Sequence, residues 1–415
     1  MNKNAKQKPL IRVQGFDDAW EQRKLESLCI KFTDGDWIEA KDQSDSGVRL
    51  VQTGNVGVTE YLDKPNNKKW ISEETFNRLH CEEVLPGDIL ISRLPEPAGR
   101  ACIMPALETK MITAVDCTIV RTAPEINNKF LVQYLSSQSY FKEVNTCLAG
   151  GTRQRISRSN LANFDIPVPT DKAEQDAIGE FLDNLDNLIT LHQRELEKII
   201  SVRKAMIERM FPQGGSNVPA VRFGQYKQPW NFCRFSQIFK ERHVVDTISK
   251  EYPQLAFTIE EGVIRPEDKK TNKRDFLIID KATKKYLRTE YNDIIYNPAN
   301  VIYGAIHRNS FGKGCVSPIY KIFYTDQDPS FMECIVRNPS FIKAISRSME
   351  GTVKKLRTLK PESFLEMGAY IAPTIDEQRQ IGEFFCQLDR LIELENKELE
   401  KIKHIKTACL EKMFV

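Results

Sequence analysis

The stretch that decides the fold is DKAEQDAIGEFLDNLDNLITLHQRELEKIISVRKAMIERMF, residues 171–211, because it returns without a gap as residues 374–414. The second copy reads TIDEQRQIGEFFCQLDRLIELENKELEKIKHIKTACLEKMF, and 20 of the 41 aligned positions are identical. The repeated unit is about half the chain long, which is too long for a solenoid. The repeat therefore predicts a molecule of two related halves with a pseudo-two-fold internal symmetry.

Apolar residues in both stretches recur at steps of three and four, which is typical of helices that pair through a heptad seam. The residues expected to pair the helices are Ile178, Leu185, Ile189, Leu196, Ile199, Ile381, Leu388, Ile392, Leu399 and Ile402. About 37 helical residues at about 1.5 Å each would give a rod of about 55 Å. We expect the two rods to form an antiparallel coiled coil within one chain. A homodimeric coiled coil is the alternative, which the tether between the copies disfavours by raising their effective concentration.

Polar residues interrupt the apolar seam at matching places. They are His192 and Arg203 in the first copy, and Glu395 and Lys406 in the second. In an antiparallel pair, His192 and Glu395 would both fall near the midpoint, so we expect them to meet and fix the register. The alternative is that both side chains point outward at a loose crossing.

The regions before the two long helices differ in most positions but follow the same order. Each begins with an aromatic segment in which Trp20 and Trp230 match, and these two residues are expected to be core anchors. Short runs rich in Ile follow, such as Asp88–Ser92 and its counterpart Asp293–Asn297, and they indicate strands. Helical stretches are expected at 127–144 and 330–347. The predicted class is α+β, with globular domains at 1–170 and 222–373, long helices at 171–211 and 374–415, and a linker at 212–221.

Composition excludes several classes of protein. The 415 residues are 41% hydrophobic and 28% charged, with a net charge of +3, so any nucleic-acid surface must be a local patch. No stretch approaches 18 uncharged apolar residues, and the start MNKNAKQKP lacks the apolar core of a signal peptide. The ten cysteines are scattered, which argues against a zinc site or a disulfide framework. We expect a cytoplasmic protein without a metal site.

The motifs of an enzyme active site are missing from the sequence. Phe311–Gly314 lacks the upstream glycine and the hydroxyl residue of a phosphate-binding loop. Asn297–Asn300 is similar to the signature of amino-methyltransferases but lacks its second proline and its aromatic residue, so a turn is the better interpretation. The five histidines have no spaced Cys or Ser partner. We predict a chain that is not an enzyme by itself, has no catalytic residue and binds no cofactor.

Two basic turns at matching positions instead suggest DNA binding. Glycine allows a close approach to phosphate, hydroxyls donate to it, and arginine neutralises it or forms a bidentate pair with guanine. The candidate residues in these turns are Gly151, Thr152, Arg153, Arg155 and Arg158 in the first half and Gly351, Thr352, Lys354, Lys355 and Arg357 in the second. A solvated charged loop is the alternative for each turn. Polar residues in neighbouring loops are further candidates, namely Arg49, Gln52, Asn55, Arg93, Arg100, Asn297, Asn300, His307, Arg308 and Lys313.

The segments DAWEQRKL (18–25), GGTRQRIS (150–157) and IPVPTDKAEQDAIGEFLDNLDNLI (166–189) resemble those of type I restriction–modification specificity subunits. The resemblance extends over essentially the whole chain. It implies two target-recognition domains separated by helical spacers, and a bipartite double-stranded DNA site with one half-site read by each domain. The second basic turn departs from the Arg-Gln-Arg pattern of the first.

The same resemblance implies partners that carry the chemistry. Methylation subunits, two in number, would transfer a methyl group from S-adenosylmethionine to adenine. Restriction subunits would add ATP- and Mg²⁺-dependent translocation and cleavage. The length of the rods would then set the gap between the two half-sites, because B-DNA rises about 3.4 Å per base pair. The alternative is a non-catalytic coiled-coil scaffold whose heads bind protein. Sequence-specific adenine methylation by the assembled complex would distinguish the two.

Overall fold

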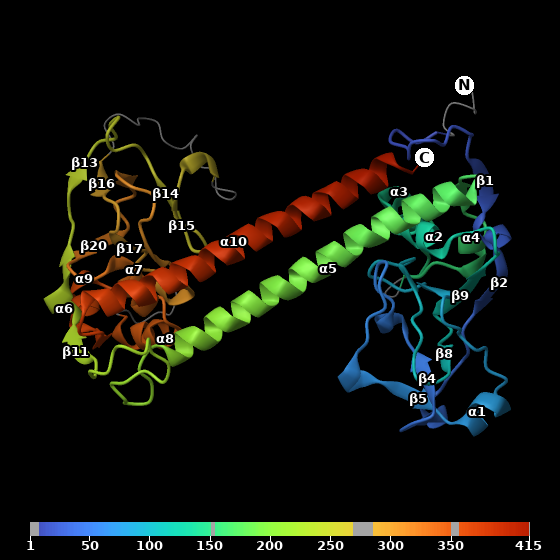
Figure 1. Ribbon diagram of the computed structural model, residues 1–415, viewed down its shortest axis with the longest axis horizontal. Helices are drawn as coiled ribbons and strands as arrows, with labels where there is room; N and C mark the ends of the chain where they lie inside the picture. The colour runs from blue at the N-terminus through green and yellow to red at the C-terminus, as the bar shows by residue number, and fades with distance from the viewer. Residues whose placement is uncertain (1–7, 151–153, 269–284, 350–356, 415) are drawn as a thin grey trace. The chain divides into compact units, whose positions relative to one another are not determined.

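The computed structural model describes residues 8–150, 154–268, 285–349 and 357–414 of the chain. The chain divides into two compact units, residues 1–193 with 397–415 and residues 194–396. Two long helices, α5 (Lys172–Arg209) and α10 (Ile375–Lys412), cross this division, so each contributes one part to either unit (Figure 1). Each has 38 residues, close to the expected 37.

The described part of the first unit contains two four-stranded sheets and a two-stranded ribbon. Their strand orders are β2-β9-β6-β7, β3-β5-β4-β8 and β1-β10. Neighbours pair antiparallel except β4 and β8, which are parallel. The strands are β1 (Glu21–Lys24), β2 (Cys29–Asp34), β3 (Gln43–Ser44), β4 (Val48–Val51), β5 (Lys69–Ile71), β6 (Ile89–Ser92), β7 (Ala101–Ile103), β8 (Met111–Thr113), β9 (Cys117–Thr122) and β10 (Asp165–Val168).

The described part of the second unit has a sheet that corresponds to the first sheet of the other unit. Its order, β12-β20-β17-β18, matches β2-β9-β6-β7, and β11-β21 matches β1-β10. The remaining sheets are β13-β16-β19 and β14-β15. The strands are β11 (Asn231–Arg234), β12 (Phe239–Glu241), β13 (Val245–Asp246), β14 (Ala256–Thr258), β15 (Gly262–Ile264), β16 (Tyr286–Thr289), β17 (Ile294–Tyr296), β18 (Ile306–Arg308), β19 (Gly314–Val316), β20 (Lys321–Thr325) and β21 (Gly368–Ile371). The strands expected at Asp88–Ser92 and Asp293–Asn297 are therefore central strands of matching sheets.

Short helices cover these sheets, and each stretch expected to be one helix is two. The first unit has α1 (Glu73–Arg78), α2 (Asn128–Tyr134), α3 (Gln138–Thr146) and α4 (Arg158–Ala162), and the second has α6 (Phe235–Ile238), α7 (Pro329–Val336), α8 (Pro339–Ser348) and α9 (Pro361–Glu366). The break before α3 has a local cause, because the Ser137 hydroxyl accepts a hydrogen bond from the Tyr140 amide and caps a new helix. The break before α8 comes from Asn338 as the cap and Pro339 at the first helical position.

Each hydrophobic core is completed by the end of a long helix. In the first unit, the Phe414 ring at the end of α10 lies 6.4 Å from Trp20 and 5.5 Å from Phe130, centroid to centroid. In the second unit, the Phe211 ring just beyond α5 lies 5.8 Å from Trp230 and 5.7 Å from Phe331. Both tryptophans are 1% exposed, which confirms that they are core anchors.

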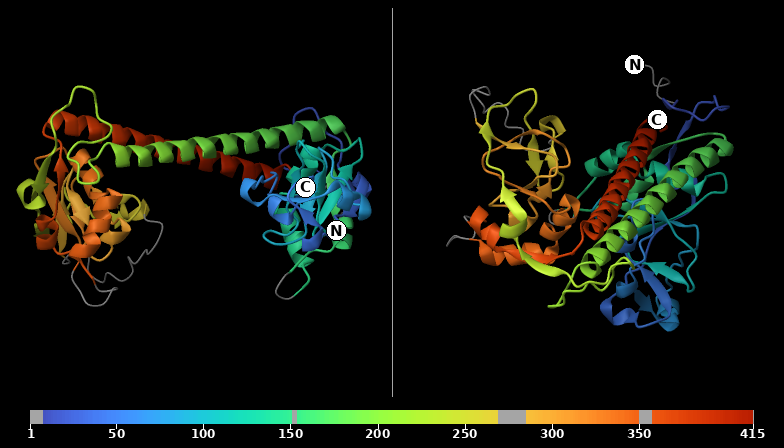
Figure 2. Two further views of the ribbon diagram at one scale, coloured as in Figure 1. Left: turned by 90° about the horizontal axis from the view of Figure 1, so that it is seen from below. Right: turned by 60° about the vertical axis from the view of Figure 1, so that its left-hand side comes forward.

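Within each unit, the two long helices lie side by side and run in opposite directions (Figure 2). Ile178 and Leu185 of α5 share the first core with Ile402 of α10, and Ile381 and Leu388 of α10 belong to the second core or pack against it. The remaining seam residues expected to pair the helices, Ile189, Leu196, Ile199, Ile392 and Leu399, are buried or half-buried. His192 lies in the first unit and Glu395 in the second, so their pairing stays a prediction.

The repeated motif Glu-Gln-x-x-Ile-Gly has a structural explanation at the start of each long helix. Glu174 accepts hydrogen bonds from the Arg12 guanidinium at 2.7 and 2.8 Å, and Glu377 accepts the equivalent pair from Arg222. Gln175 accepts a hydrogen bond from the amide of Asn127, the residue that caps α2. In the second unit, Gln378 accepts from the amide of the corresponding cap of α7. The motif thus fixes each long helix to the head beside it.

Candidate nucleic-acid interface

The first basic turn is anchored to the end of the central strand β6. Gly151, Thr152 and Arg153 lie outside the described residues. Arg155 and Ala149 exchange two backbone hydrogen bonds of 2.9 and 3.0 Å, and the Ile156 amide donates to the Arg93 carbonyl at 3.1 Å. The Ile156 side chain is fully buried, whereas Arg155 and Arg158 are exposed. The buried isoleucine therefore holds the turn, and the arginines on either side of it reach solvent.

Two aspartates form ion pairs with arginines in and beside this turn. Arg93 and Arg158 approach the same carboxylate, that of Asp34 at the end of β2, at 3.5 and 3.8 Å. Arg155 lies 3.7 Å from Asp116. Such long, exposed ion pairs contribute little to stability, so the guanidinium groups of Arg155 and Arg158 can exchange these partners for a phosphate at small cost. The structure thus brings together three of the predicted residues, Arg93, Arg155 and Arg158.

Two other arginine candidates of the first unit are buried and hold loops. The Arg100 guanidinium donates hydrogen bonds of 2.6 to 2.9 Å to the carbonyls of Val56, Leu94, Pro97 and Thr53. Arg49 lies over the Trp70 ring and donates to the Lys69 carbonyl.

The two amide candidates of the first unit close a turn. Asn55 is buried; its carbonyl oxygen accepts from the amide of half-buried Gln52 and its amide group donates to Leu62. In this structure Arg49, Asn55 and Arg100 shape the loops of the head, and contact of these residues and Gln52 with DNA stays a prediction.

The residue Leu359, which follows the second basic turn, is anchored in the same way as Ile156. Gly351, Thr352, Lys354 and Lys355 lie outside the described residues, and Arg357 is exposed. Leu359, fully buried, donates its amide hydrogen to the Pro298 carbonyl at 3.0 Å. Its own carbonyl accepts from the Tyr296 hydroxyl at the end of β17. Leu359 lies 203 residues after Ile156, which is the offset of the long-helix repeat.

The turn after β17 carries the remaining asparagine candidates. The Asn297 side chain accepts hydrogen bonds from the amides of Ala299 and Asn300, and so closes the turn that its sequence predicts. A single 3₁₀ turn, Val301–Tyr303, follows and leaves the Tyr303 side chain 69% exposed. An exposed aromatic residue therefore lies next to the turn on which the second basic segment is anchored.

His307, Arg308 and Lys313 do not form one cluster of free cations. His307 is buried with Nε2 2.7 Å from the Ile259 carbonyl, and burial lowers its pKa to about 4, so it is neutral at pH 7. Arg308 donates to Glu333 and Asn292. Lys313 pairs with Glu251 at 2.6 Å. Of the three, Lys313 is the exposed one, because more than half of its side chain reaches solvent.

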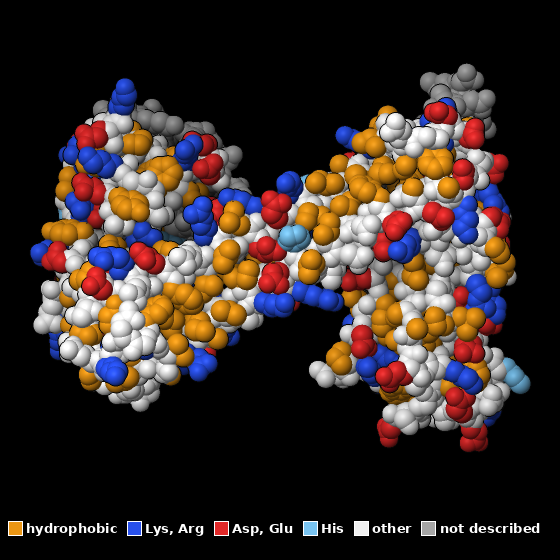
Figure 3. Space-filling view, in the orientation of Figure 1, with side chains coloured by type: hydrophobic (Ala, Val, Ile, Leu, Met, Phe, Trp, Pro, Cys, Tyr) orange, Lys and Arg blue, Asp and Glu red, His pale blue; other side chains and the backbone are white. Residues whose placement is uncertain are grey.

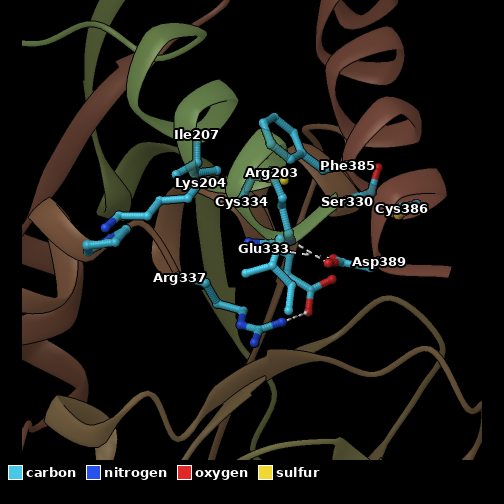
Figure 4. Close-up of a pocket in the computed structure, with 12 residues that line it drawn as sticks. Arg203, Lys204, Ile207, Ser330, Glu333, Cys334, Arg337, Phe385, Cys386 and Asp389 are labelled. Carbon is cyan, nitrogen blue, oxygen red and sulfur yellow. Dashed lines mark hydrogen bonds and ion pairs between the residues drawn. The ribbon is translucent and has the colours of Figure 1, made fainter. Parts of the chain in front are cut away.

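A cavity of about 200 Å³ opens in the second unit between α5, α7 and α10 (Figure 4). The Arg203 guanidinium points across it to the Asp389 carboxylate, and Arg337 lies 3.6 Å from Glu333. The first unit has a matching ion pair between Asp186 and Lys406, 203 positions away in each case. Because Arg203 pairs with Asp389 and Arg337 with Glu333, we interpret this cluster as a contact that holds the helices.

The sequence-based analysis missed two exposed aromatic residues and one acidic residue near the basic turns. Trp37, which follows Asp34 by three positions, is 72% exposed, and the Tyr303 side chain is 69% exposed. The sequence could have predicted the exposure of Trp37, because the residue follows Asp-Gly-Asp directly after a strand, where a loop is expected. The role of Asp34 as a shared partner of two arginines had no local signal.

Neither a metal site nor a membrane span is present among the described residues. Within the described ranges, no group of three or more His, Cys, Asp or Glu side chains is placed to hold a metal ion. In the same ranges, no helix combines the length and apolar character needed to cross a membrane.

Comparisons with known proteins point to one group of relatives. Residues 17–200 match the family model of the type I restriction modification DNA specificity domain. The type I restriction enzyme MjaVIII specificity subunit of Methanocaldococcus jannaschii is 22% identical over 276 residues, which is 61% of this chain and 62% of that protein. The putative type I restriction enzyme MjaX specificity subunit of the same organism is 21% identical over 421 residues, covering 94% and 92%. The chain thus spans less than two thirds of the first relative and nearly all of the second.

The same fold occurs in a solved structure. The crystal structure of the type I restriction–modification system S subunit from M. genitalium aligns with a TM-score of 0.65 at 16% identity, covering 98% of this chain and 99% of that one. Both chains therefore share the α+β fold with two long helices. Residues 17–200 are thus similar to the DNA specificity domain of type I restriction–modification systems, and the chain as a whole is similar to specificity subunits of these systems.

These comparisons bear on several expectations from the sequence. The α+β class with two long helices is shared with the solved S subunit. The matched domain and both relatives are named for specificity, which supports a specificity role and does not favour a scaffold whose heads bind protein. The DNA-contacting residues and the domain boundaries remain predictions.

Proposed function

We propose that the chain recognises an asymmetric, bipartite site in double-stranded DNA and directs adenine methylation by partner subunits. Each head would read one half-site with the loops around its basic turn. The two half-sites would differ in sequence, because these loops differ between the heads while the long helices stay alike.

The observation that carries this proposal is the shared anchoring of the basic turn. In both units a buried aliphatic residue, Ile156 or Leu359, is hydrogen-bonded to the loop after the central strand, at Arg93 or Pro298. Arg155 in the first head and Arg357 in the second therefore lie within two residues of this anchor in the sequence, although the residues of the anchoring loop differ. Phosphate contacts position a protein on DNA and varied side chains read the bases, so a constant anchor beside a variable loop suits sequence recognition.

We also propose a docking surface for the methylation subunits on the long helices. Leu188 and Leu191 of α5 are exposed in the first unit, and Leu391 and Leu394 of α10 are exposed at the matching positions in the second. Figure 3 shows hydrophobic side chains gathered along the helices. Two equivalent apolar surfaces suit two equivalent partners. Replacing Leu191 and Leu394 by serine should abolish co-purification of these partners, whereas serine at the exposed Glu197 should not.

The chemistry would belong to the partners. S-adenosylmethionine is expected on the methylation subunits, and ATP with Mg²⁺ on restriction subunits where these are present. We place the assembled complex in the cytoplasm, where its DNA substrate would be.

A reconstituted methylation assay tests the proposal. The chain and the methylation subunits that co-purify with it are incubated with S-adenosylmethionine and a library of random duplexes, and the methylated adenines are mapped by sequencing. We expect one bipartite motif with two different halves, and no methylation when the chain is left out. Methylation that needs no specificity chain, or that shows no sequence preference, would overturn the proposal.

A further inference from the structure

Trp37 is unusually exposed for a tryptophan. Its side chain is 72% exposed, whereas Trp20 and Trp230 are 1% exposed and Trp70 is half-buried. Single exposed aliphatic residues are ordinary on protein surfaces. An exposed indole is less so, because tryptophan is highly buried on average and its large apolar face gains most from a partner.

The backbone that carries Trp37 is fixed. Gly35 donates its amide hydrogen to the Cys117 carbonyl and Asp36 donates to Thr113, both at 2.9 Å. The Asp36 carboxylate in turn accepts from the Glu82 amide at 2.9 Å. A Cβ atom on Gly35 would lie 2.6 Å from the Ala114 carbonyl oxygen, so this loop packs directly on residues 113–117. The indole is therefore presented to solvent by a rigid support, and little conformational entropy would be lost on binding.

The same support connects Trp37 to the arginines of the basic turn. Asp34, three residues before Trp37, is the carboxylate that Arg93 and Arg158 approach. Asp116 lies within the segment on which the Trp37 loop packs, and it pairs with Arg155. The indole and the exposed guanidinium groups thus extend from adjoining loops of one head. Aromatic side chains next to cations are the combination with which proteins contact bases and phosphates together.

We propose that Trp37 is a DNA-contacting residue that places its indole against the face of a nucleobase in the first half-site, while Arg155 and Arg158 bind the adjacent phosphates. This inference rests on the proposed function. An apolar side chain inserted at a base step, or stacked on an unstacked base, uses the face that all four bases share. Trp37 would therefore strengthen binding and favour deformable steps, and the polar loop residues would read the base edges.

The test measures the affinity of the complex with its methylation subunits for two labelled duplexes, by fluorescence anisotropy. One duplex contains the methylated motif and the other a scrambled sequence. Trp37→Ala should weaken binding to the motif about tenfold or more, because stacking is worth about 1–3 kcal/mol per base. Trp37→Phe, which keeps an aromatic face, should stay within about threefold of the wild type. Leu10→Ala, at another exposed apolar residue, is the control and should have no effect.

The outcomes separate this inference from the proposed function. Unchanged affinity of Trp37→Ala for the motif would overturn the inference and leave the function intact. Loss of the methylation subunits from Trp37→Ala, with the affinity of the remaining complex unchanged, would overturn it in favour of a protein contact. If the wild-type complex fails to distinguish the motif from the scrambled duplex, the proposed function itself is wrong. Thermal unfolding of each variant excludes loss of the fold as the cause.

Discussion

Arg203 of α5 donates hydrogen bonds through both Nε and Nη2 to the carboxylate of Asp389 on α10, within the second unit. The residues 203 positions away, Lys406 and Asp186, form the matching ion pair within the first unit. Arg203 and Lys406 occupy positions at which the apolar seam is interrupted. Each of these two interruptions therefore has an acidic partner on the facing helix of the same unit, and both basic residues are part of the helix contact.

Removing the carboxylate should destabilise the second unit. Asp389→Ala leaves the Arg203 guanidinium half-buried without its partner, so we expect the free energy of unfolding to fall by about 1 kcal/mol in urea denaturation. The exchanged pair Arg203→Asp with Asp389→Arg should recover part of this loss. Glu383→Ala, at an exposed position of the same helix, is the control. Equal stability of Asp389→Ala and Glu383→Ala would show that the Arg203–Asp389 pair does not stabilise the second unit.

The glycines of the repeated motif should not tolerate a side chain. A Cβ atom on Gly179 would lie 2.6 Å from the Phe130 amide nitrogen, and one on Gly382 would lie 2.8 Å from that of Phe331. Each long helix passes this closely over the first turn of α2 or α7. We expect Gly179→Ala or Gly382→Ala to cost about 1–3 kcal/mol of stability, since packed surroundings must shift. Gly224→Ala, where a Cβ would meet nothing within 4 Å, should be neutral in the same denaturation experiment.

Stability should depend on pH through His307. Burial lowers the pKa of His307 to about 4 from its ordinary value of 6.5. Between these values the unfolded chain holds the proton and the folded chain does not, so stability falls as pH decreases from about 6.5 to 4. One pKa unit corresponds to about 1.4 kcal/mol, which makes the contribution on the order of 3 kcal/mol.

Substitution of His307 isolates this contribution. The free energy of unfolding of His307→Gln should vary less over this range than that of the wild type, whereas His243→Gln, at an exposed histidine, should follow the wild type. Parallel pH curves for His307→Gln and the wild type would show that His307 does not titrate in this way.

The basic turn should contribute salt-dependent affinity for DNA. Replacing Arg155 and Arg158 by alanine removes two exposed cations and leaves the buried anchor Ile156 in place. We expect weaker binding to both motif and scrambled duplexes, and a slope of log affinity against log salt that is smaller by about 1–2. Lys227→Ala, at an exposed lysine of the other unit, is the control. An unchanged salt slope in the double variant would exclude the turn from the interface.

The sequence predicted the elements whose signals are local. The heptad steps give the long helices to within a few residues, and the alternation of Ile-rich runs with turns locates β6 and β17. The helix breaks at Ser137 and Pro339 also had local signals, because both residues favour the first positions of a helix. They were overlooked within stretches that are apolar enough to be one helix.

The rest depends on contacts between distant parts of the chain. Arg100 was a candidate for DNA contact because it flanks a Pro-rich loop, yet four carbonyls from two loops surround its guanidinium. Asp34 becomes the partner of Arg93 and Arg158 only when the end of β2 meets the basic turn. The exposure of Trp37 likewise depends on the packing of its loop on residues 113–117. The order of residues along the chain cannot show which of these side chains becomes buried, paired or exposed.

The central claim is that this chain chooses which DNA sequence is methylated, and the methylome of the host tests it most directly. Adenine methylation would be mapped by long-read sequencing in a strain that carries the chain, in a strain from which it is deleted, and in the deletion strain with the chain restored. We predict that one bipartite motif with unlike halves loses its methylation on deletion and regains it on restoration. An identical set of methylated motifs in all three strains would contradict the account.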